Sequence, residues 1–115
     1  MITSSSLIEP PGWIIDFIPA FSKEEISEYI EKIKGWSAKQ TGEGFYFLNK
    51  EFKFANFANS LNFINKVSEI AENENHHPDL EFGCGYARIT IFTHAINGLA
   101  ESDFILAAKI DEISV

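Results

Sequence analysis

The sequence predicts an α+β fold: a four-stranded antiparallel sheet with three helices packed on one face. Segments with a helical spacing of apolar residues alternate with pairs of strand-like segments, in the order helix, strand, strand, helix, strand, strand, helix. Short turns that contain glycine join the strands of each pair, so each pair is expected to form a hairpin. Hairpins make the sheet antiparallel, and the helices then cover one of its faces.

The composition is that of one folded domain. The chain has 115 residues, of which 45% are hydrophobic and 14% aromatic, enough for an ordinary core and too much for a disordered protein. Residues 1–20 contain Pro10-Pro11-Gly12 and show no sustained period, so we expect an irregular N-terminal arm. The folded domain is expected to comprise residues 21–115.

The first helix is predicted to begin after Ser22, because Ser22-Lys-Glu-Glu25 is a capping-box pattern. An apolar stripe at spacings of four and three follows, made up of Ile26, Ile30 and Ile33. The helix should continue to about Lys34 and end at Gly35, in the position beyond the C-cap.

Two strands, 36–40 and 45–54, are expected around a hairpin turn at 41–44. The second strand has large apolar side chains on both of its faces, at Phe45, Tyr46, Phe47 and Leu48. A sheet with only one covered face would alternate apolar and polar residues there. Both faces are therefore expected to be covered, and in so short a chain another subunit can supply the second cover.

Residues 55–73 have the clearest helical pattern, with an apolar side formed by Phe57, Leu61, Ile64, Val67 and Ala71. Pro78 disfavours helical backbone at His77, so this helix must stop before that residue. Strands 79–84 and 86–94 follow, with the isoleucines of the second strand facing the helices and His94 at its end on the other face. Glu101 or Ser102 is expected to open the last helix.

The chemistry is expected to lie between Glu72 and Asp103, a stretch that contains all three histidines: His76, His77 and His94. Free imidazole titrates at roughly pH 6.5, so a histidine cluster suits proton transfer to and from a bound organic substrate. Glu72 precedes His76 by four residues and could fix its tautomer. Asp79 or Asp103 could do the same for His77 or His94, and spacing alone does not choose between them.

Two other interpretations of the histidines are open. They could be surface side chains stabilised by a helix terminus. They could also hold zinc, which accepts three imidazoles and a water. Adjacent histidines are an awkward ligand pair and no helical His-x-x-x-His is present, so no metal site is predicted. The single cysteine, Cys84, excludes an intramolecular disulfide and a cysteine-rich zinc site.

The charge and the hydropathy exclude several classes of partner. The net charge is −8, which disfavours nucleic acid because phosphate binding needs clustered lysine and arginine. No apolar run is long enough to cross a membrane, and the N-terminus lacks the features of a secretory signal. A cytoplasmic protein is expected.

Over roughly residues 22–113, the chain resembles the pterin-4a-carbinolamine dehydratases, also known as the DCoH family of dimerisation cofactors. The motifs that carry the resemblance include Gly35-Trp36, Ala71-Glu72, His76-His77-Pro78-Asp79, Thr93-His94, Gly98-Leu99 and Asp103. The resemblance implies a hydro-lyase that removes water from a 4a-hydroxytetrahydropterin to give the quinonoid dihydropterin, as in tetrahydrobiopterin recycling. It also implies a homo-oligomer, dimer or tetramer, with no metal or cofactor because the pterin is the substrate.

The resemblance assigns roles to individual residues. It implies that His76, His77 and His94 are the catalytic set, with Glu72 and Asp103 as orienting carboxylates. His77 is favoured as the acid that protonates the hydroxyl, and His94 or His76 as the base. The substrate-binding residues implied are Asn75, His76, His77, Phe92, Thr93, His94 and Ala95. These roles require the three imidazoles to converge on one cavity.

Three positions depart from the family pattern, and other functions are open. Cys84 stands where an aromatic residue is usual, Ala95 where an acidic residue commonly follows Thr-His, and Ala100 where Ser or Thr usually caps the last helix. Ser102 could compensate for Ala100. The alternative function is a non-catalytic dimerisation module of the transcriptional-coactivator type, and a third is a scaffold that binds pterin without turnover.

Overall fold

The computed structural model describes residues 19–115, so most of the predicted arm, residues 1–18, lies outside the described residues. The elements follow the predicted order: α2 (Lys23–Ile30), β1 (Ser37–Gln40), β2 (Tyr46–Lys53), α3 (Phe57–Glu74), β3 (Asp79–Gly83), β4 (Tyr86–Ile91), the short 3₁₀ helix η2 (His94–Ile96) and α4 (Glu101–Asp111). The four strands form one antiparallel sheet in the order β1-β2-β4-β3. The predicted fold class is confirmed.

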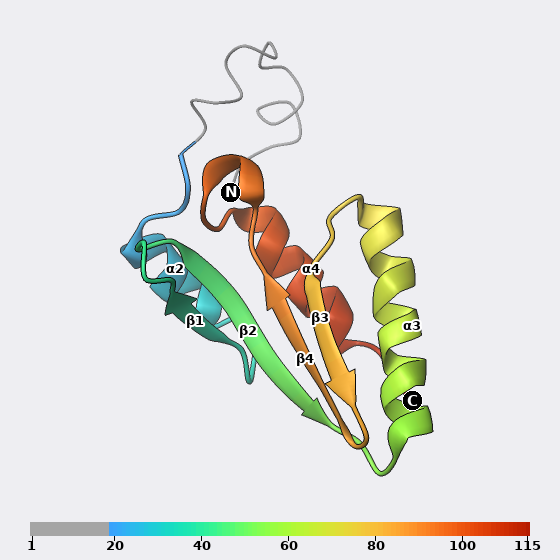
Figure 1. The fold of residues 1–115 in the computed structure, drawn as a ribbon. Helices are drawn as coiled ribbons and strands as arrows, with labels where there is room; N and C mark the ends of the chain where they lie inside the picture. Colours follow the sequence, from blue (N-terminus) through green and yellow to red (C-terminus); the bar gives the residue numbers. More distant parts are fainter. Residues whose placement is uncertain (1–18) are drawn as a thin grey trace.

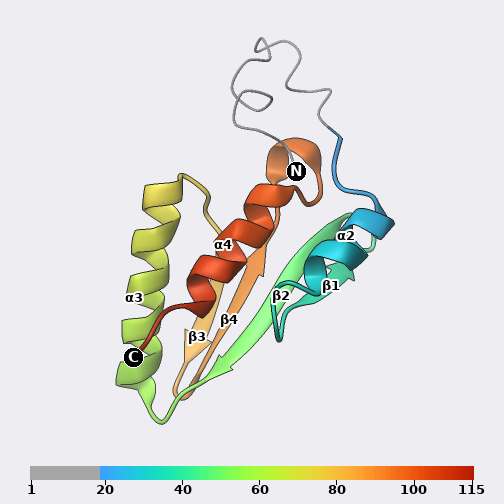
Figure 2. The same cartoon turned by 180° about the vertical axis from the view of Figure 1, so that it is seen from behind.

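The α-helices lie together on one face of the sheet, and the other face is open (Figure 1). In the view from behind, α2 lies over β1 and β2, and α4 crosses the central strands (Figure 2). In both views α3 runs along the β3 edge of the sheet. None of the helices among residues 19–115 has both the length and the apolar character that crossing a bilayer requires.

The core lies between the helices and the covered face of the sheet. Leu48 of β2 pairs with Ile91 of β4, and both side chains are fully buried, as is Ile89. The helices contribute their own buried residues, among them Phe63, Val67, Leu106 and Ile110. Burial of one such side chain stabilises the fold by about 1.5–3 kcal/mol. The predicted orientation of the β4 isoleucines toward the helices is confirmed.

The first helix is shorter than predicted. Ser22 and Glu25 form the expected capping box, but α2 ends at Ile30 and not near Lys34. Beyond Ile30 the backbone N–H groups bond to the carbonyl three residues earlier, as in a 3₁₀ turn; one such bond joins the Ile33 N–H to the Ile30 carbonyl at 3.3 Å. Ile33 is buried as predicted, but it lies in this turn and not in the α-helix. Gly35 has φ +82° in the turn before β1 and is not the helix cap.

The buried face of α3 is also rotated relative to the prediction. Ile64, Val67 and Ala71 are buried as expected, but Phe57 and Leu61 near its start are 49% and 38% exposed. Phe63 is buried in their place. In both views the start of α3 runs along the edge strand and not over the sheet. Phe57 and Leu61, which lie near that start, therefore do not reach the core.

The strand predicted over 86–94 ends at Ile91, which leaves Thr93 and His94 outside the sheet. The chain turns at that point because Thr93 forms an isolated antiparallel bridge with Gly98 and η2 begins at His94. This turn leads directly into α4, which begins at Glu101 as one of the two predicted alternatives. The segment that contains His94 therefore lies at the N-terminal end of α4 (Figure 1).

Candidate active site

The end of α3 directs His76 toward α4. Asn75 adopts the left-handed conformation (φ 50°, ψ 43°), and its N–H bonds to the carbonyls of Ala71 and Glu72. The N–H of His76 also bonds to the Ala71 carbonyl, at 3.0 Å. These contacts end the helix one residue before His76, so its side chain does not follow the helix face on which Glu72 lies.

His76 is paired with Asp103, 27 residues further along the chain. The distance from His76 Nε2 to Asp103 Oδ1 is 2.6 Å, with the His76 side chain 18% exposed and the Asp103 side chain fully buried. Spacing suggested Glu72 as the partner of His76, and left Asp79 or Asp103 open as a partner of His77 or His94. The pairing of Glu72 with His76 is wrong, because the helix ends before His76 and α4 packs beside that end; Asp103 binds His76 and Glu72 binds His77.

Asp103 occupies the first turn of α4, where its second oxygen accepts two more hydrogen bonds. Oδ2 accepts from the backbone N–H of Ala100 and from the hydroxyl of Thr93, each at 2.8 Å. Asp103 therefore makes the backbone contact of a capping box, although Ala100 has no side chain that could complete it. Asp103 thus makes only the half of the capping box that involves the Ala100 N–H, and Ser102 is exposed.

His77 lies on the solvent side of the same turn. Its Nε2 is hydrogen-bonded to Glu72 Oε2, and both side chains are more than half exposed. Glu72 thus orients a histidine, as predicted, but the ring belongs to His77. A hollow of about 290 Å³ is lined by His77 and Glu72 together with Ala71, Pro78 and Leu80.

His94 begins η2 and packs against Phe92, with ring centroids 4.2 Å apart. The turn that holds it is closed by two backbone hydrogen bonds between Thr93 and Gly98, of 2.9 and 3.4 Å. Asn97 ends the turn in the left-handed conformation (φ 48°). Ala95, predicted to bind substrate, is an exposed residue of η2.

The structure therefore joins two of the three histidine segments through one carboxylate. Asp103 binds His76 directly and binds Thr93, the residue before His94. His77 has a separate, exposed partner, and the hollow beside it includes neither His76 nor His94. Convergence of all three rings on one cavity stays a prediction.

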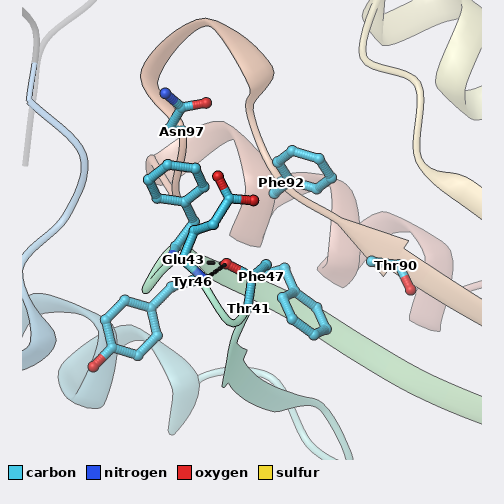
Figure 3. Close-up of a pocket in the computed structure, with 8 residues that line it drawn as sticks. Thr41, Glu43, Tyr46, Phe47, Thr90, Phe92 and Asn97 are labelled. Carbon is cyan, nitrogen blue, oxygen red and sulfur yellow. Dashed lines mark hydrogen bonds between the residues drawn. The ribbon is translucent and has the colours of Figure 1, made fainter.

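A second hollow, of about 360 Å³, lies on the open face of the sheet near the β1–β2 turn. Its walls include Phe45, Phe47 and Phe92, with Glu43 and Asn97 at its edge. Figure 3 shows the carboxylate of Glu43 pointing toward the Phe92 ring, while Tyr46 points away. The sequence analysis did not assign Glu43 and Asn97 to a site. The sequence signal for this hollow was the presence of apolar side chains on both faces of β2, which predicted that the open face is covered by another subunit.

The N-terminal end of α4 is also tied to α2. The hydroxyl of Tyr29 donates to Glu101 Oε2 at 2.9 Å, and this hydrogen bond, with burial and nearby carboxylates, raises the pKa of Tyr29. The rings of Phe21, Tyr29 and Phe104 pack together around this contact. Among residues 19–115, no three His, Cys, Asp or Glu side chains are grouped as a metal site would require.

A model of the family described as pterin 4 alpha carbinolamine dehydratase matches residues 19–113. The chain belongs to this family. A relative from Rubrobacter xylanophilus, named "Putative pterin-4-alpha-carbinolamine dehydratase", is 44% identical over 96 residues, which are 84% of this chain and 86% of the relative. A relative of the same name from Alkaliphilus metalliredigens is 42% identical over 95 residues, 82% of each chain.

Among solved structures, the chain is similar to one from Brucella melitensis described as a transcriptional coactivator/pterin dehydratase. The TM-score is 0.72 at 26% identity, over 80% of this chain and 95% of the other. Membership of the pterin dehydratase family is thus supported by both sequence and fold.

Proposed function

We propose that this protein is a hydro-lyase that removes water from 4a-hydroxytetrahydropterins, the dehydration step of tetrahydrobiopterin recycling. The family supports the reaction class. The observation that carries the proposal is the pair formed by His76 and the fully buried Asp103, at 2.6 Å. A carboxylate that holds one ring nitrogen fixes the tautomer and leaves the other nitrogen for proton transfer.

The reaction needs one proton donor and one proton acceptor. The 4a-hydroxyl leaves as water after it receives a proton from an imidazolium. As the C4a–O bond breaks, the N5 lone pair forms the C4a=N5 double bond and the N5 proton passes to a neutral imidazole. The acid has then lost one proton and the base has gained one, so exchange with solvent restores both groups. General acid–base catalysis of this kind contributes about 10²–10⁴-fold.

We assign His76 as the base and His77 as the acid. The Nε2 of each ring is bound by a carboxylate, so Nδ1 is the reacting atom in both. The Asp103 partner of His76 is buried, which holds this ring in one orientation. His77 is exposed and can regain a proton from water between turnovers. His94, packed on Phe92, is assigned to the pterin-binding surface as the third histidine.

The proposal includes no metal and no separate cofactor, because the pterin is the substrate. It includes a cytoplasmic homo-oligomer, dimer or tetramer, with a pterin as the small-molecule partner and no nucleic acid or membrane. The apolar hollow around Phe45, Phe47 and Phe92 on the open sheet face supports association.

Turnover of freshly generated 4a-hydroxytetrahydropterin, followed by stopped-flow absorbance, tests the proposal. Wild type should accelerate loss of the carbinolamine, and His77→Ala should lose most of that acceleration. Glu69→Gln, an exposed change one turn earlier on α3, should match wild type. A wild-type rate equal to the uncatalysed rate would reject the enzyme assignment, and tight pterin binding with no rate effect would identify a binding scaffold.

The alternative is a non-catalytic dimerisation or coactivator-type module. It is favoured by exposed apolar side chains along α3 and β3, namely Phe57, Leu61 and Leu80. A stable heteromeric complex that survives substitution of all three histidines would support this alternative.

A further inference from the structure

We propose that Thr93 is a positioning residue, whose hydroxyl aims Asp103 at His76, and that it does not contact the pterin. The family resemblance had suggested a substrate-binding role for Thr93. The inference rests on the proposed acid–base role of His76. It adds a residue that acts on the base from a distance, through the buried carboxylate.

The hydroxyl of Thr93 is already committed. A threonine hydroxyl has one proton to donate, and that of Thr93 is donated to Asp103 Oδ2 at 2.8 Å. Hydrogen bonds to a charged acceptor are about twice as strong as those between neutral groups. Redirecting this proton to a substrate would leave a fully buried carboxylate with one donor fewer, which is costly.

The two donors to Oδ2 set the direction of the other oxygen. The carboxylate is planar, so fixing Oδ2 between the Thr93 hydroxyl and the Ala100 N–H also fixes Oδ1. Oδ1 is the atom that contacts His76 Nε2. With an alanine at the N-cap of α4, no side chain at that position can share this task. Thr93 is thus the one side chain, apart from His76, that binds this carboxylate among the described residues.

The backbone holds Thr93 in place for this role. Its N–H bonds to the Gly98 carbonyl at 2.9 Å, and the pairing closes the turn that contains His94. The absence of a side chain at Gly98 also leaves room for Ala20, because a Cβ at position 98 would lie 2.7 Å from the Cβ of Ala20. Thr93 therefore holds Asp103 through its side chain and the start of the His94 turn through its backbone.

The test compares Thr93→Val, which keeps the shape and removes the hydroxyl, with Thr93→Ser, which keeps the hydroxyl. Thr90→Val is the matched control, because Thr90 lies three residues earlier, in β4, and its hydroxyl accepts from the Asn49 side chain at 3.0 Å. We expect kcat to fall about 10–100-fold in Thr93→Val with KM unchanged, by analogy with the scale for residues that orient metal-binding histidines. The kcat values of Thr93→Ser and Thr90→Val should remain within about threefold of the wild-type value, well short of the loss expected for Thr93→Val.

A second measurement does not depend on catalysis. Proton–nitrogen NMR of ¹⁵N-histidine-labelled protein should show His76 with its proton on Nε2 in wild type and Thr93→Ser. In Thr93→Val that proton should exchange faster with water or be shared with Nδ1. The NMR result stands even if wild type has no dehydratase activity, so failure of this inference and failure of the proposed function are distinguishable.

Two results would overturn the inference. One is a raised KM in Thr93→Val with kcat and the His76 signals unchanged, which would make Thr93 a substrate contact. The other is wild-type kinetics and wild-type His76 signals in Thr93→Val. If that variant does not fold, Thr93→Ala is measured by the same two criteria, and a His76 tautomer and kcat equal to those of Thr93→Ser would contradict the inference.

Discussion

Two carboxylates near the candidate site bind histidines in very different surroundings. Asp103 is fully buried and has three hydrogen-bond donors within 2.8 Å. Glu72 is 75% exposed, and its contact with His77 is open to water. Exposed ion pairs contribute about 0–1 kcal/mol, whereas leaving a buried polar group unsatisfied costs about 1–3 kcal/mol. The same type of contact should therefore have unequal consequences at the two positions.

We predict that Asp103→Asn reduces both activity and stability, because an amide cannot accept from His76, Thr93 and Ala100 together. The free energy of unfolding should fall by about 1–3 kcal/mol, measured by chemical denaturation. Glu72→Gln should change it by less than about 1 kcal/mol. Equal effects of the two substitutions would show that burial does not distinguish these carboxylates.

At the scale of elements, the site depends on how α4 meets its neighbours. The first turn of α4 contributes Asp103 to His76 and Glu101 to Tyr29 of α2. The Tyr29–Glu101 hydrogen bond therefore holds the end of α4 whose Asp103 binds His76. This contact gives the packing of α2 on α4 a dependence on pH.

The hydrogen bond to Glu101 raises the pKa of Tyr29 above its ordinary value of 10.0, so the neutral phenol is favoured in the folded state. The stability from this contact is fully present below about pH 10 and is lost as the pH rises through the folded pKa. Unfolding free energies measured from neutral to alkaline pH should fall less steeply in Tyr29→Phe than in wild type. Tyr86→Phe serves as the control, and parallel curves for Tyr29→Phe and wild type would refute the prediction.

At the scale of the whole molecule, the two faces of the sheet differ. One face is buried under the helices, while the open face combines aromatic side chains near the β1–β2 turn with a row of charges formed by Glu51, Arg88 and Glu81. Hydrogen bonds from Lys53 and Arg88 lower the pKa of Glu51, so this carboxylate stays charged and keeps that end of the face polar. The aromatic end is the part suited to a second copy of the chain.

We predict that Phe47→Asp lowers the oligomeric state, because a charge in the apolar hollow opposes its burial against a partner. Sedimentation velocity should show wild type as a dimer or tetramer and Phe47→Asp as a smaller species. Ser37→Asp, on the exposed edge strand, should leave the assembly unchanged. A monomeric wild type at micromolar concentration would contradict the prediction.

Local signals in the sequence were enough to predict the order and type of the elements. The capping box at Ser22 marked the start of α2, Pro78 limited α3, and the alternation through Ile89 and Ile91 gave the orientation of β4. Each depends on contacts between residues close in the chain. The errors in the fold arose where longer-range packing decided the outcome, as at Ile33 and at the exposed Phe57.

The sequence by itself determined the fold class, the family resemblance and the set of histidines and carboxylates. Only the tertiary structure decided which carboxylate meets which ring, because His76 and Asp103, 27 positions apart in the chain, are brought together by the packing of α4 beside the end of α3. The spacing of four between Glu72 and His76 has meaning only within a continuous helix, and Asn75 ends that helix one residue too soon. Hydrogen-bond partners across a core follow from the arrangement of elements in space, which spacing along the chain does not specify.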